Sequence, residues 1–419
     1  MKKTISLLLA LLMCFGLSAC SAKEEAPAEE PEETVEETAE ETVEEETNSV
    51  EAPTPAAENG VITADEWEAV YPDQVASFKA NAENTYRVSY IEEDPYIVTL
   101  YEGYGFAKDY GSAIGHEYTL QDVAETKRPH PLANCLTCKT PDFTKLVNDL
   151  GVEVYKMDFE EVMAQMTQNI SCYNCHANDV PNLAVTHSYV TNALGSAMEG
   201  INAEVLACGQ CHIEYYFDPE TKETMMPYDS VEAMDPESIY AYYTDQGFSD
   251  WTCESTGTGM IKAQHPEMET FLGEGSVHKG MLSCADCHME TVTKDDGSTF
   301  KSHTLVSPLQ SEAILETCAA CHKDTDMKEK VATIQEEITA RETEIGTQLE
   351  TLHNDLAKAV ADGSLDEATL AEVQALYREA QWYWDFIYVE NSEGAHNSTM
   401  SRRCLDKAEE LLAKANELF

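Results

Sequence analysis

The clearest periodic pattern of the chain lies near its C-terminus. From about residue 327, apolar side chains recur at intervals of three and four, the spacing that places them on one face of an α-helix, with an interruption at Arg341. These apolar positions are Val331, Ile334, Ile338, Ile345, Leu349, Leu352 and Leu356. The spacing predicts a long amphipathic helix. The simplest partner for its apolar face is the rest of the same chain.

Two further helices are predicted after this one. "DGSL" at 362–365 ends the first helix, and Ser364 with Glu367 matches the capping box that opens the next. That second helix carries the aromatic run "WYWDFIY" at 382–388, and a last helix is predicted over 402–418. We therefore expect a long-helix region over 326–419.

The middle of the chain has a different pattern. Residues 61–325 contain few strand-like alternations and many short helical runs broken by Gly and Pro. We expect a mainly α fold with a domain over 61–325 followed by the long helices.

The N-terminus has the pattern of an export signal. Lys2 and Lys3 precede an apolar run from Ile5 to Phe15, which is too short to span a membrane. The segment "LSAC" resembles the lipobox of bacterial lipoproteins, which implies a signal peptide over 1–19 and lipid on Cys20. Such a lipid tethers a protein to a membrane surface. We expect an exported, extracytoplasmic, lipid-anchored protein; the alternative is an ordinary signal peptide that ends by chance at a cysteine.

Residues 20–60 are almost entirely Glu, Ala, Pro and Thr. This composition cannot bury a core and its like charges repel, so it predicts an acidic disordered stalk. The whole chain of 419 residues carries a net charge of −52, more than the stalk contributes. A surface this acidic repels nucleic acid and favours either a basic partner or simple solubility.

Ten of the fourteen cysteines occur in C-x-x-C pairs. The five segments are "CLTCK" (Cys135, Cys138, Lys139), "CYNCH" (Cys172, Cys175, His176), "CGQCH" (Cys208, Cys211, His212), "CADCH" (Cys284, Cys287, His288) and "CAACH" (Cys318, Cys321, His322). In C-x-x-C-H the thiols form thioethers with haem vinyl groups and the adjacent imidazole is placed to bind the iron. The motifs predict covalent haem c.

Zinc and disulfides are the alternatives for paired cysteines in an exported protein. Neither explains why four of the five pairs are followed directly by histidine, and an odd number of pairs does not suit zinc. Cys253 and Cys404 belong to no pair. They either bond to each other or are two unrelated buried thiols.

Lys139 stands where the first motif would have histidine. An amine can bind iron once it has lost its proton, and metal coordination favours that loss. Four histidines beyond the motifs would complete the other four haems. A haem with Lys139 on one side and no assigned ligand on the other would have an open position for a substrate.

The order of one C-x-x-C-K and four C-x-x-C-H motifs resembles the pentahaem cytochrome c nitrite reductases, the ammonia-forming family. The resemblance covers roughly residues 65–400. Family segments are matched by "GHEYTLQDVAETKR" (115–128), "CGQCHIEYYF" (208–217), "KAQHPE" (262–267) and "VHKGMLSCADCHM" (277–289). It implies five covalent haems in a mainly α multihaem cytochrome c domain with long C-terminal helices.

Each functional residue follows from the resemblance by its position in these segments. Lys139 would hold the catalytic haem, and Arg128, Tyr215 and His265 would line its distal pocket. The distal ligands would be His303 for the haem on Cys172 and Cys175, His116 for that on Cys208 and Cys211, His396 for that on Cys284 and Cys287, and His278 for that on Cys318 and Cys321. His130, His187 and His353 match no ligand position.

The resemblance also implies one calcium ion beside the catalytic haem. Its ligands would be the Glu214 carboxylate, the backbone carbonyls of Tyr215 and Lys262, and the Gln264 side-chain oxygen, an all-oxygen set that suits a hard divalent cation. One departure is the short stretch of six residues between Arg128 and Cys135, where many family members have a longer insertion.

The activity implied is the six-electron reduction of nitrite to ammonium. The implied partners are nitrite, a membrane-bound multihaem quinol dehydrogenase as electron donor, and a second copy of the chain, with the long helices forming a homodimer. Two alternatives remain: a non-catalytic multihaem electron carrier, and a related reductase of hydroxylamine, nitric oxide or sulfite.

Overall fold

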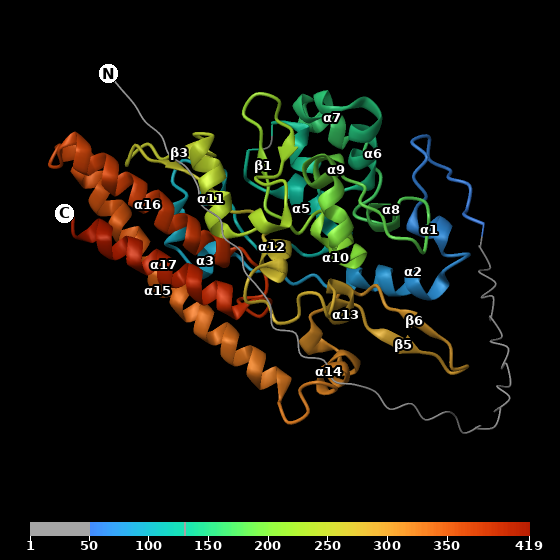
Figure 1. The fold of residues 1–419 in the computed structure, drawn as a ribbon. Coiled ribbons are helices and arrows are strands. Elements are labelled where there is room, and N and C mark those ends of the chain that lie inside the picture. The colour runs from blue at the N-terminus through green and yellow to red at the C-terminus, as the bar shows by residue number, and fades with distance from the viewer. Residues whose placement is uncertain (1–50, 130) are drawn as a thin grey trace, which may run out of the picture. The chain divides into compact units, whose positions relative to one another are not determined.

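The computed structural model describes residues 51–129 and 131–419, and over this part of the chain the predicted mainly α fold is confirmed (Figure 1). The proposed signal peptide at 1–19, Cys20, most of the stalk and His130 lie outside the described residues. The described residues belong to one compact unit, so the predicted division at residues 325 and 326 stays a prediction.

The helices before residue 326 are short. They are α1 (Ala64–Trp67), α2 (Pro72–Lys79), α3 (Tyr90–Glu93), α4 (Ile97–Leu100), α5 (Thr119–Glu125), α6 (Pro141–Leu150), α7 (Phe159–Met163), α8 (Cys172–His176), α9 (Ser188–Leu194), α10 (Ala203–Gly209), α11 (Pro236–Asp245), α12 (Glu267–Leu272), α13 (Cys284–His288) and α14 (Glu312–Ala319). Short 3₁₀ helices connect several of them, including one over Ala133–Leu136.

Strands are few and form only two-stranded antiparallel hairpins within the described residues. The hairpins are β1 (Tyr216–Phe217) with β2 (Thr224–Met225), β3 (Trp251–Thr252) with β4 (Gly259–Met260), and β5 (Thr291–Thr293) with β6 (Thr299–Lys301).

Helix caps fix where two of the cysteine motifs begin. Ser171 stands before α8 and Ser283 before α13, and each serine forms a reciprocal capping box with the third residue of its helix. The Ser283 hydroxyl oxygen accepts a hydrogen bond from the backbone N–H of Asp286 at 3.3 Å. Because such a cap satisfies N–H groups that have no partner within the helix, the turn forms directly at the first cysteine.

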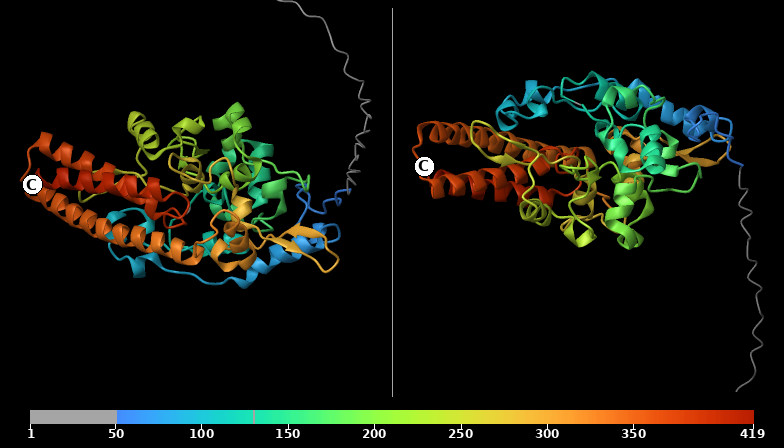
Figure 2. Two further views of the ribbon diagram at one scale, coloured as in Figure 1. Left: turned by 60° about the horizontal axis from the view of Figure 1, so that its bottom comes forward. Right: turned by 90° about the horizontal axis from the view of Figure 1, so that it is seen from above.

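Three long helices form the C-terminal region: α15 (Met327–Asp362), α16 (Glu367–Tyr388) and α17 (Ser398–Asn416). They pack against one another, as Figure 2 shows in orange and red. Five of the predicted apolar positions of α15 are fully buried within the chain: Ile338, Ile345, Leu349, Leu352 and Leu356. The predicted long helix is confirmed, and its apolar face packs inside the chain.

Buried contacts join these helices to the shorter elements. The Asp385 carboxylate of α16 accepts hydrogen bonds from the Tyr101 hydroxyl and the Lys262 ammonium, the latter at 3.1 Å. Gly346 of α15 lies against the ring of Tyr96, which leaves no room for a side chain there. One hydrophobic core therefore runs from the short elements into the long helices. Among the described helices, none combines the length and the apolar character needed to cross a membrane.

Candidate active site

The five cysteine motifs occupy adjoining elements. The first lies on the 3₁₀ helix over Ala133–Leu136 and the turn after it, and the "CYNCH" and "CADCH" motifs form α8 and α13 themselves. The "CGQCH" and "CAACH" motifs lie at the ends of α10 and α14. α10 contacts both α8 and α13, and α13 contacts α14. The fold therefore gathers motifs that are up to about 180 residues apart in the sequence.

Each of the four motif histidines faces a histidine from elsewhere in the chain, and His212 faces two, because the ring of His265 also lies 6.3 Å from it. The pairs, with the distances between ring centroids, are His176 with His303 at 6.4 Å, His212 with His116 at 6.3 Å, His288 with His396 at 6.1 Å, and His322 with His278 at 6.3 Å. These are the four pairings that the family resemblance implies.

The separations fit one metal atom between each pair. An imidazole nitrogen lies about 2 Å from a bound transition metal, so two imidazoles on opposite sides place their ring centroids about 6 Å apart. The four pairs thus have room for an iron with two axial imidazoles, as low-spin haem requires.

Hydrogen bonds hold several of these imidazoles in a ligand-competent orientation. The Nδ1 atoms of His176, His288 and His303 donate to the backbone carbonyls of Asn182 (2.9 Å), Val306 (3.1 Å) and Lys301 (2.9 Å). His396 Nδ1 donates to Glu390 Oε1 at 2.6 Å. A proton held on Nδ1 leaves the Nε2 lone pair for a metal, which is the usual outer-shell arrangement of ligating histidine. Glu390 carries no motif signal, so sequence reasoning missed it.

The cysteine pairs are also close to one another. Thiols of different motifs interact in the combinations Cys138 with Cys211, Cys208 with Cys284, Cys287 with Cys318, and Cys175 with Cys211. The hydrogen bond between Cys138 and Cys211 lowers the pKa of Cys138 to about 7. Four motifs therefore form a series in space, and the motif of α8 adjoins this series at Cys211.

The three predicted pocket residues lie around the first motif. Burial, and then the nearby thiols of Cys138 and Cys135, raise the pKa of Tyr215, while the Arg128 guanidinium acts in the opposite direction. The pKa of His265 is lowered to about 4, chiefly by desolvation, with Lys139 among the positive groups that contribute. The fold thus brings Arg128, Tyr215 and His265 to the motif that carries Lys139.

Local contacts orient two of the groups at this motif. The Arg128 guanidinium lies 4.5 Å from the centroid of the Phe106 ring, and its Nε donates to Thr126 Oγ1 at 3.1 Å. Stacking on an aromatic face is typical of arginine, whose planar guanidinium is also suited to binding anions. The carbonyl oxygen of Lys139 accepts a hydrogen bond from Thr119 Oγ1 at 2.6 Å, which fixes the turn after Cys138.

The predicted calcium ligands also lie together. Glu214 is fully buried; its carboxylate accepts hydrogen bonds from the Tyr243 hydroxyl at 2.9 Å and from the backbone N–H of Gln264 at 2.6 Å. The Gln264 side-chain nitrogen lies 2.9 Å from the carbonyl oxygen of Lys262. If the Gln264 side-chain amide is flipped, its oxygen takes the place of its nitrogen. The amide oxygen and the Lys262 carbonyl oxygen then point to the same position, as ligands of one cation must.

The buried carboxyl groups around Glu214 support a cation there. Desolvation raises the pKa of Glu214 well above its ordinary range, and it raises those of Asp250 and Glu269 to about 7. Glu269 Oε2 is buried without a hydrogen-bond partner among the described residues. Three buried carboxyl groups with an unmatched oxygen fit a divalent cation, which would offset their charge. Asp250 and Glu269 lie outside the motifs and were not predicted.

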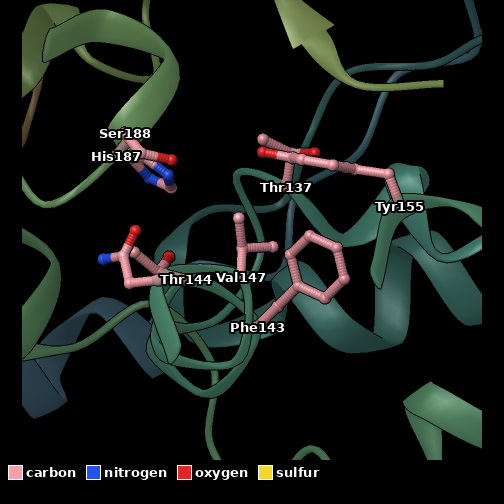
Figure 3. Close-up of a pocket in the computed structure, with 8 residues that line it drawn as sticks. Thr137, Phe143, Thr144, Val147, Tyr155, His187 and Ser188 are labelled. Carbon is pink, nitrogen blue, oxygen red and sulfur yellow. The ribbon is translucent and has the colours of Figure 1, made fainter. Parts of the chain in front are cut away.

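The remaining cysteines and histidines have other surroundings. Cys253 and Cys404 are both free and buried, so they are two separate thiols. His187 Nε2 lies 3.3 Å from Cys211 Sγ and also faces a small cavity lined by Thr137, Phe143, Val147 and Tyr155 (Figure 3). None of Arg128, Tyr215 and His265 lines this cavity. Thr137 of the first motif lines it, and it is separate from the three predicted pocket residues.

The chain is similar to known proteins over most of its length. The family model of cytochrome c552 matches residues 63–418. The chain is similar to a solved structure of NrfA, the catalytic subunit of cytochrome c nitrite reductase from Desulfovibrio desulfuricans. That structure has two calcium sites. The TM-score is 0.78 at 26% identity, over 87% of each chain.

Two other solved cytochromes match more weakly. The outer cell wall cytochrome OcwA has a TM-score of 0.40 at 19% identity, over 71% of this chain and 48% of its own. An undecahaem cytochrome from the S-layer of Carboxydothermus ferrireducens has a TM-score of 0.38 at 17% identity, over 73% of this chain and 41% of its own.

Proposed function

Because the chain belongs to the cytochrome c552 family, we propose that it reduces nitrite to ammonium by six electrons at a haem bound through Cys135, Cys138 and Lys139. The observation that carries the proposal is the gathering of Arg128, Tyr215 and His265 at this motif, the one motif whose haem has no second ligand assigned. Four further haems, each held between two histidines, would feed it.

Haem c at the first motif would supply the iron on which nitrite binds and through which electrons arrive. The protein's own contribution is positional. Arg128, held by Phe106 and Thr126, donates charge-assisted hydrogen bonds to the nitrite oxygens, and these strengthen as negative charge develops on them. We expect His265 to donate a hydrogen bond to the same oxygens and to pass protons to them, and Tyr215 to border the same pocket.

The proximity of the motifs supports an electron relay. Neighbouring thiols link the first motif to those at 208–212, 284–288 and 318–322, so the haems they hold would lie close together. A reaction that consumes six electrons needs such a supply, because one haem stores a single electron. A membrane-bound multihaem quinol dehydrogenase is the proposed donor.

The calcium ion is proposed at Glu214, Gln264 and the carbonyls of Tyr215 and Lys262. Its role is to fix the backbone on both sides of His265. Asp250 Oδ2 accepts from the Lys262 N–H at 2.8 Å and supports the same segment. A cation here also supplies positive potential beside the nitrite, in a chain whose net charge is −52.

His265→Asn tests the proposal directly. A positioned acid–base residue typically contributes about 10²- to 10⁴-fold, so ammonium formation from nitrite with a reduced dye should fall by roughly that factor. Hydroxylamine, in which one N–O bond is already broken, should be less affected and serves as the internal control.

Absorption spectra taken on the same samples separate this outcome from a misplaced ligand. The four haems between histidine pairs should keep their low-spin spectra in His265→Asn. Loss of an axial ligand from one of them, seen as conversion from low spin to high spin, would mean that His265 binds iron and that the substrate pocket lies elsewhere.

A further inference from the structure

Three side chains from distant parts of the chain converge away from the proposed haem and calcium ligands. Glu102 follows α4, Cys253 lies in the turn between β3 and β4, and His353 belongs to α15. Cys253 Sγ lies 3.2 Å from Glu102 Oε2, and His353 Nε2 lies 3.2 Å from the same oxygen. Cys253 and His353 are 1% and 3% exposed. We propose that these three side chains bind one zinc ion.

The distances match those between ligands of tetrahedral zinc. With Zn–S near 2.3 Å and Zn–N and Zn–O near 2.0 Å, neighbouring ligand atoms lie about 3.4 Å apart. The Sγ, Nε2 and Oε2 atoms all lie within 4.8 Å of one another, so one ion reaches all three after small side-chain movements. A thiolate, an imidazole and a carboxylate together suit zinc better than calcium or magnesium, which prefer oxygen alone.

Hydrogen bonding alone accounts poorly for the cluster. Oε2 of Glu102 is approached by the Cys253 thiol, the Ser255 hydroxyl and the His353 Nε2 atom. The thiol and the hydroxyl can fill the two lone pairs of this carboxylate oxygen, and an Nε2 atom that carries a lone pair has no proton to donate to it. A cation bound between these side chains would make Glu102, Cys253 and His353 its ligands, with Ser255 as a hydrogen-bond partner of a ligand. Ser255 Oγ, 3.4 Å from Cys253 Sγ, borders the position where a fourth ligand or water would bind.

The surroundings favour the protonation states that a metal needs. His353 Nδ1 lies 3.0 Å from the Tyr377 hydroxyl oxygen and donates to it when it carries the ring proton, which leaves the Nε2 lone pair free. The Glu102 side chain is 44% exposed, which gives the ion a path from solvent.

Zinc here would connect parts of the chain that the backbone joins only through long loops. Residues 102, 253 and 353 are separated by 151 and about 100 positions, and a metal that closes long loops stabilises the folded state. The β3–β4 hairpin that carries Cys253 follows Asp250, the support of the Lys262 segment. The site would therefore also stiffen one wall of the proposed calcium site.

The test uses the haem-loaded protein with calcium present and its thiols reduced. It is incubated with zinc, freed of excess metal by gel filtration, and analysed for metal content and by zinc-edge X-ray absorption. We expect one zinc per chain with a single sulfur neighbour at about 2.3 Å. Zinc held by oxygen and nitrogen alone, or no retained zinc, would overturn the proposal.

Two variants locate the ion. Cys253→Ser and His353→Gln should each weaken zinc binding by about 100-fold or more, because loss of a ligand costs at least as much as loss of an outer-shell partner. Cys404→Ser is the matched control, since Cys404 is the other buried thiol outside the C-x-x-C pairs, and it should retain zinc as the native protein does. Equal retention in Cys253→Ser and Cys404→Ser would contradict the assignment.

Discussion

At the scale of single residues, Lys139 differs from the four motif histidines in what it can donate to iron. Imidazole is neutral near pH 7 and binds iron directly, whereas an amine must first lose its proton. The proximal donor sets the electronic properties of the iron that it holds. The lysine therefore distinguishes the proposed catalytic haem from the four haems with motif histidines, which are proposed to transfer electrons.

Lys139→His should keep the fold and lower nitrite turnover. Imidazole still binds iron, so the haem stays in place, but the altered proximal donor should reduce the rate about tenfold or more, equivalent to about 1.4 kcal/mol of transition-state stabilisation. Steady-state ammonium formation measures the rate. Haem loading must be determined on the same samples, because attachment to a fifth C-x-x-C-H can differ. A fully loaded variant with the native rate would remove the case for lysine.

The motifs indicated several side chains that the fold brings together, but they gave no sign of residues whose position depends on packing alone. The pairing of His116 with His212 follows the family order, and the fold brings the two rings to 6.3 Å. Glu390, which holds His396, and Asp250, which supports Lys262, come from segments with no motif. Their positions depend on long-range packing, which spacing along one sequence does not reveal.

At the scale of secondary-structure elements, the spacing of apolar residues predicts the long helices. Their ends are set by capping residues, which the sequence identified only in part. The predicted Ser364–Glu367 capping box is wrong: Asp366 caps α16, accepting from the backbone N–H groups of Ala368 and Thr369 at 3.0 and 3.1 Å. The last helix begins at Ser398, four residues before the predicted start, because Asn397 caps it.

The apolar spacing of α15 is interrupted at Arg341 because the next residue, Glu342, occupies the interior face of the helix in place of an apolar side chain. Glu342 is 5% exposed, and its Oε1 atom has no hydrogen-bond partner among the described residues. Desolvation raises the pKa of Glu342 to about 8. The folded state therefore holds this proton between about pH 4.5 and 8 while the unfolded state releases it, so the contribution of Glu342 to stability falls as pH rises through that range.

Glu342→Gln should stabilise the protein above pH 5, and more so at pH 8. The amide keeps the shape of the neutral acid and removes the cost of ionisation, which for a pKa raised by about three units is on the order of 4 kcal/mol at pH 8. Thermal unfolding of the haem-loaded protein at pH 5 and pH 8 checks this. Glu344→Gln, on the exposed face of the same helix, is the control. Equal shifts at both pH values would contradict the account of Glu342.

At the scale of the whole molecule, charge and anchoring decide where the proposed enzyme meets its partners. The net charge of −52 disfavours nucleic acid and suits a donor with a basic docking face. The proposed lipid on Cys20 and the stalk to residue 60 would hold the haem domain at a membrane surface. The exposed face of α15 presents a row of threonines, Thr339, Thr343, Thr347 and Thr351, and belongs to the long-helix region that is proposed to form the homodimer.

Cys20→Ala should release the protein from membranes without loss of haem or of activity with a soluble dye. The substitution removes the proposed lipid site and touches nothing within residues 51–419. Fractionation of cells into membrane and soluble parts, followed by haem staining, measures the release. Membrane association that persists in the variant would mean that a bound partner, and not a lipid, tethers the chain.

The most direct test of the central claim is to count electrons and products for each nitrite consumed. The haem-loaded protein is mixed with ¹⁵N-labelled nitrite and a limiting amount of reduced dye under anaerobic conditions, and dye oxidation and labelled ammonium are both measured. The proposed reaction predicts six dye electrons and one labelled ammonium per nitrite. One electron per nitrite with release of nitric oxide, or haem oxidation with no loss of nitrite, would contradict it.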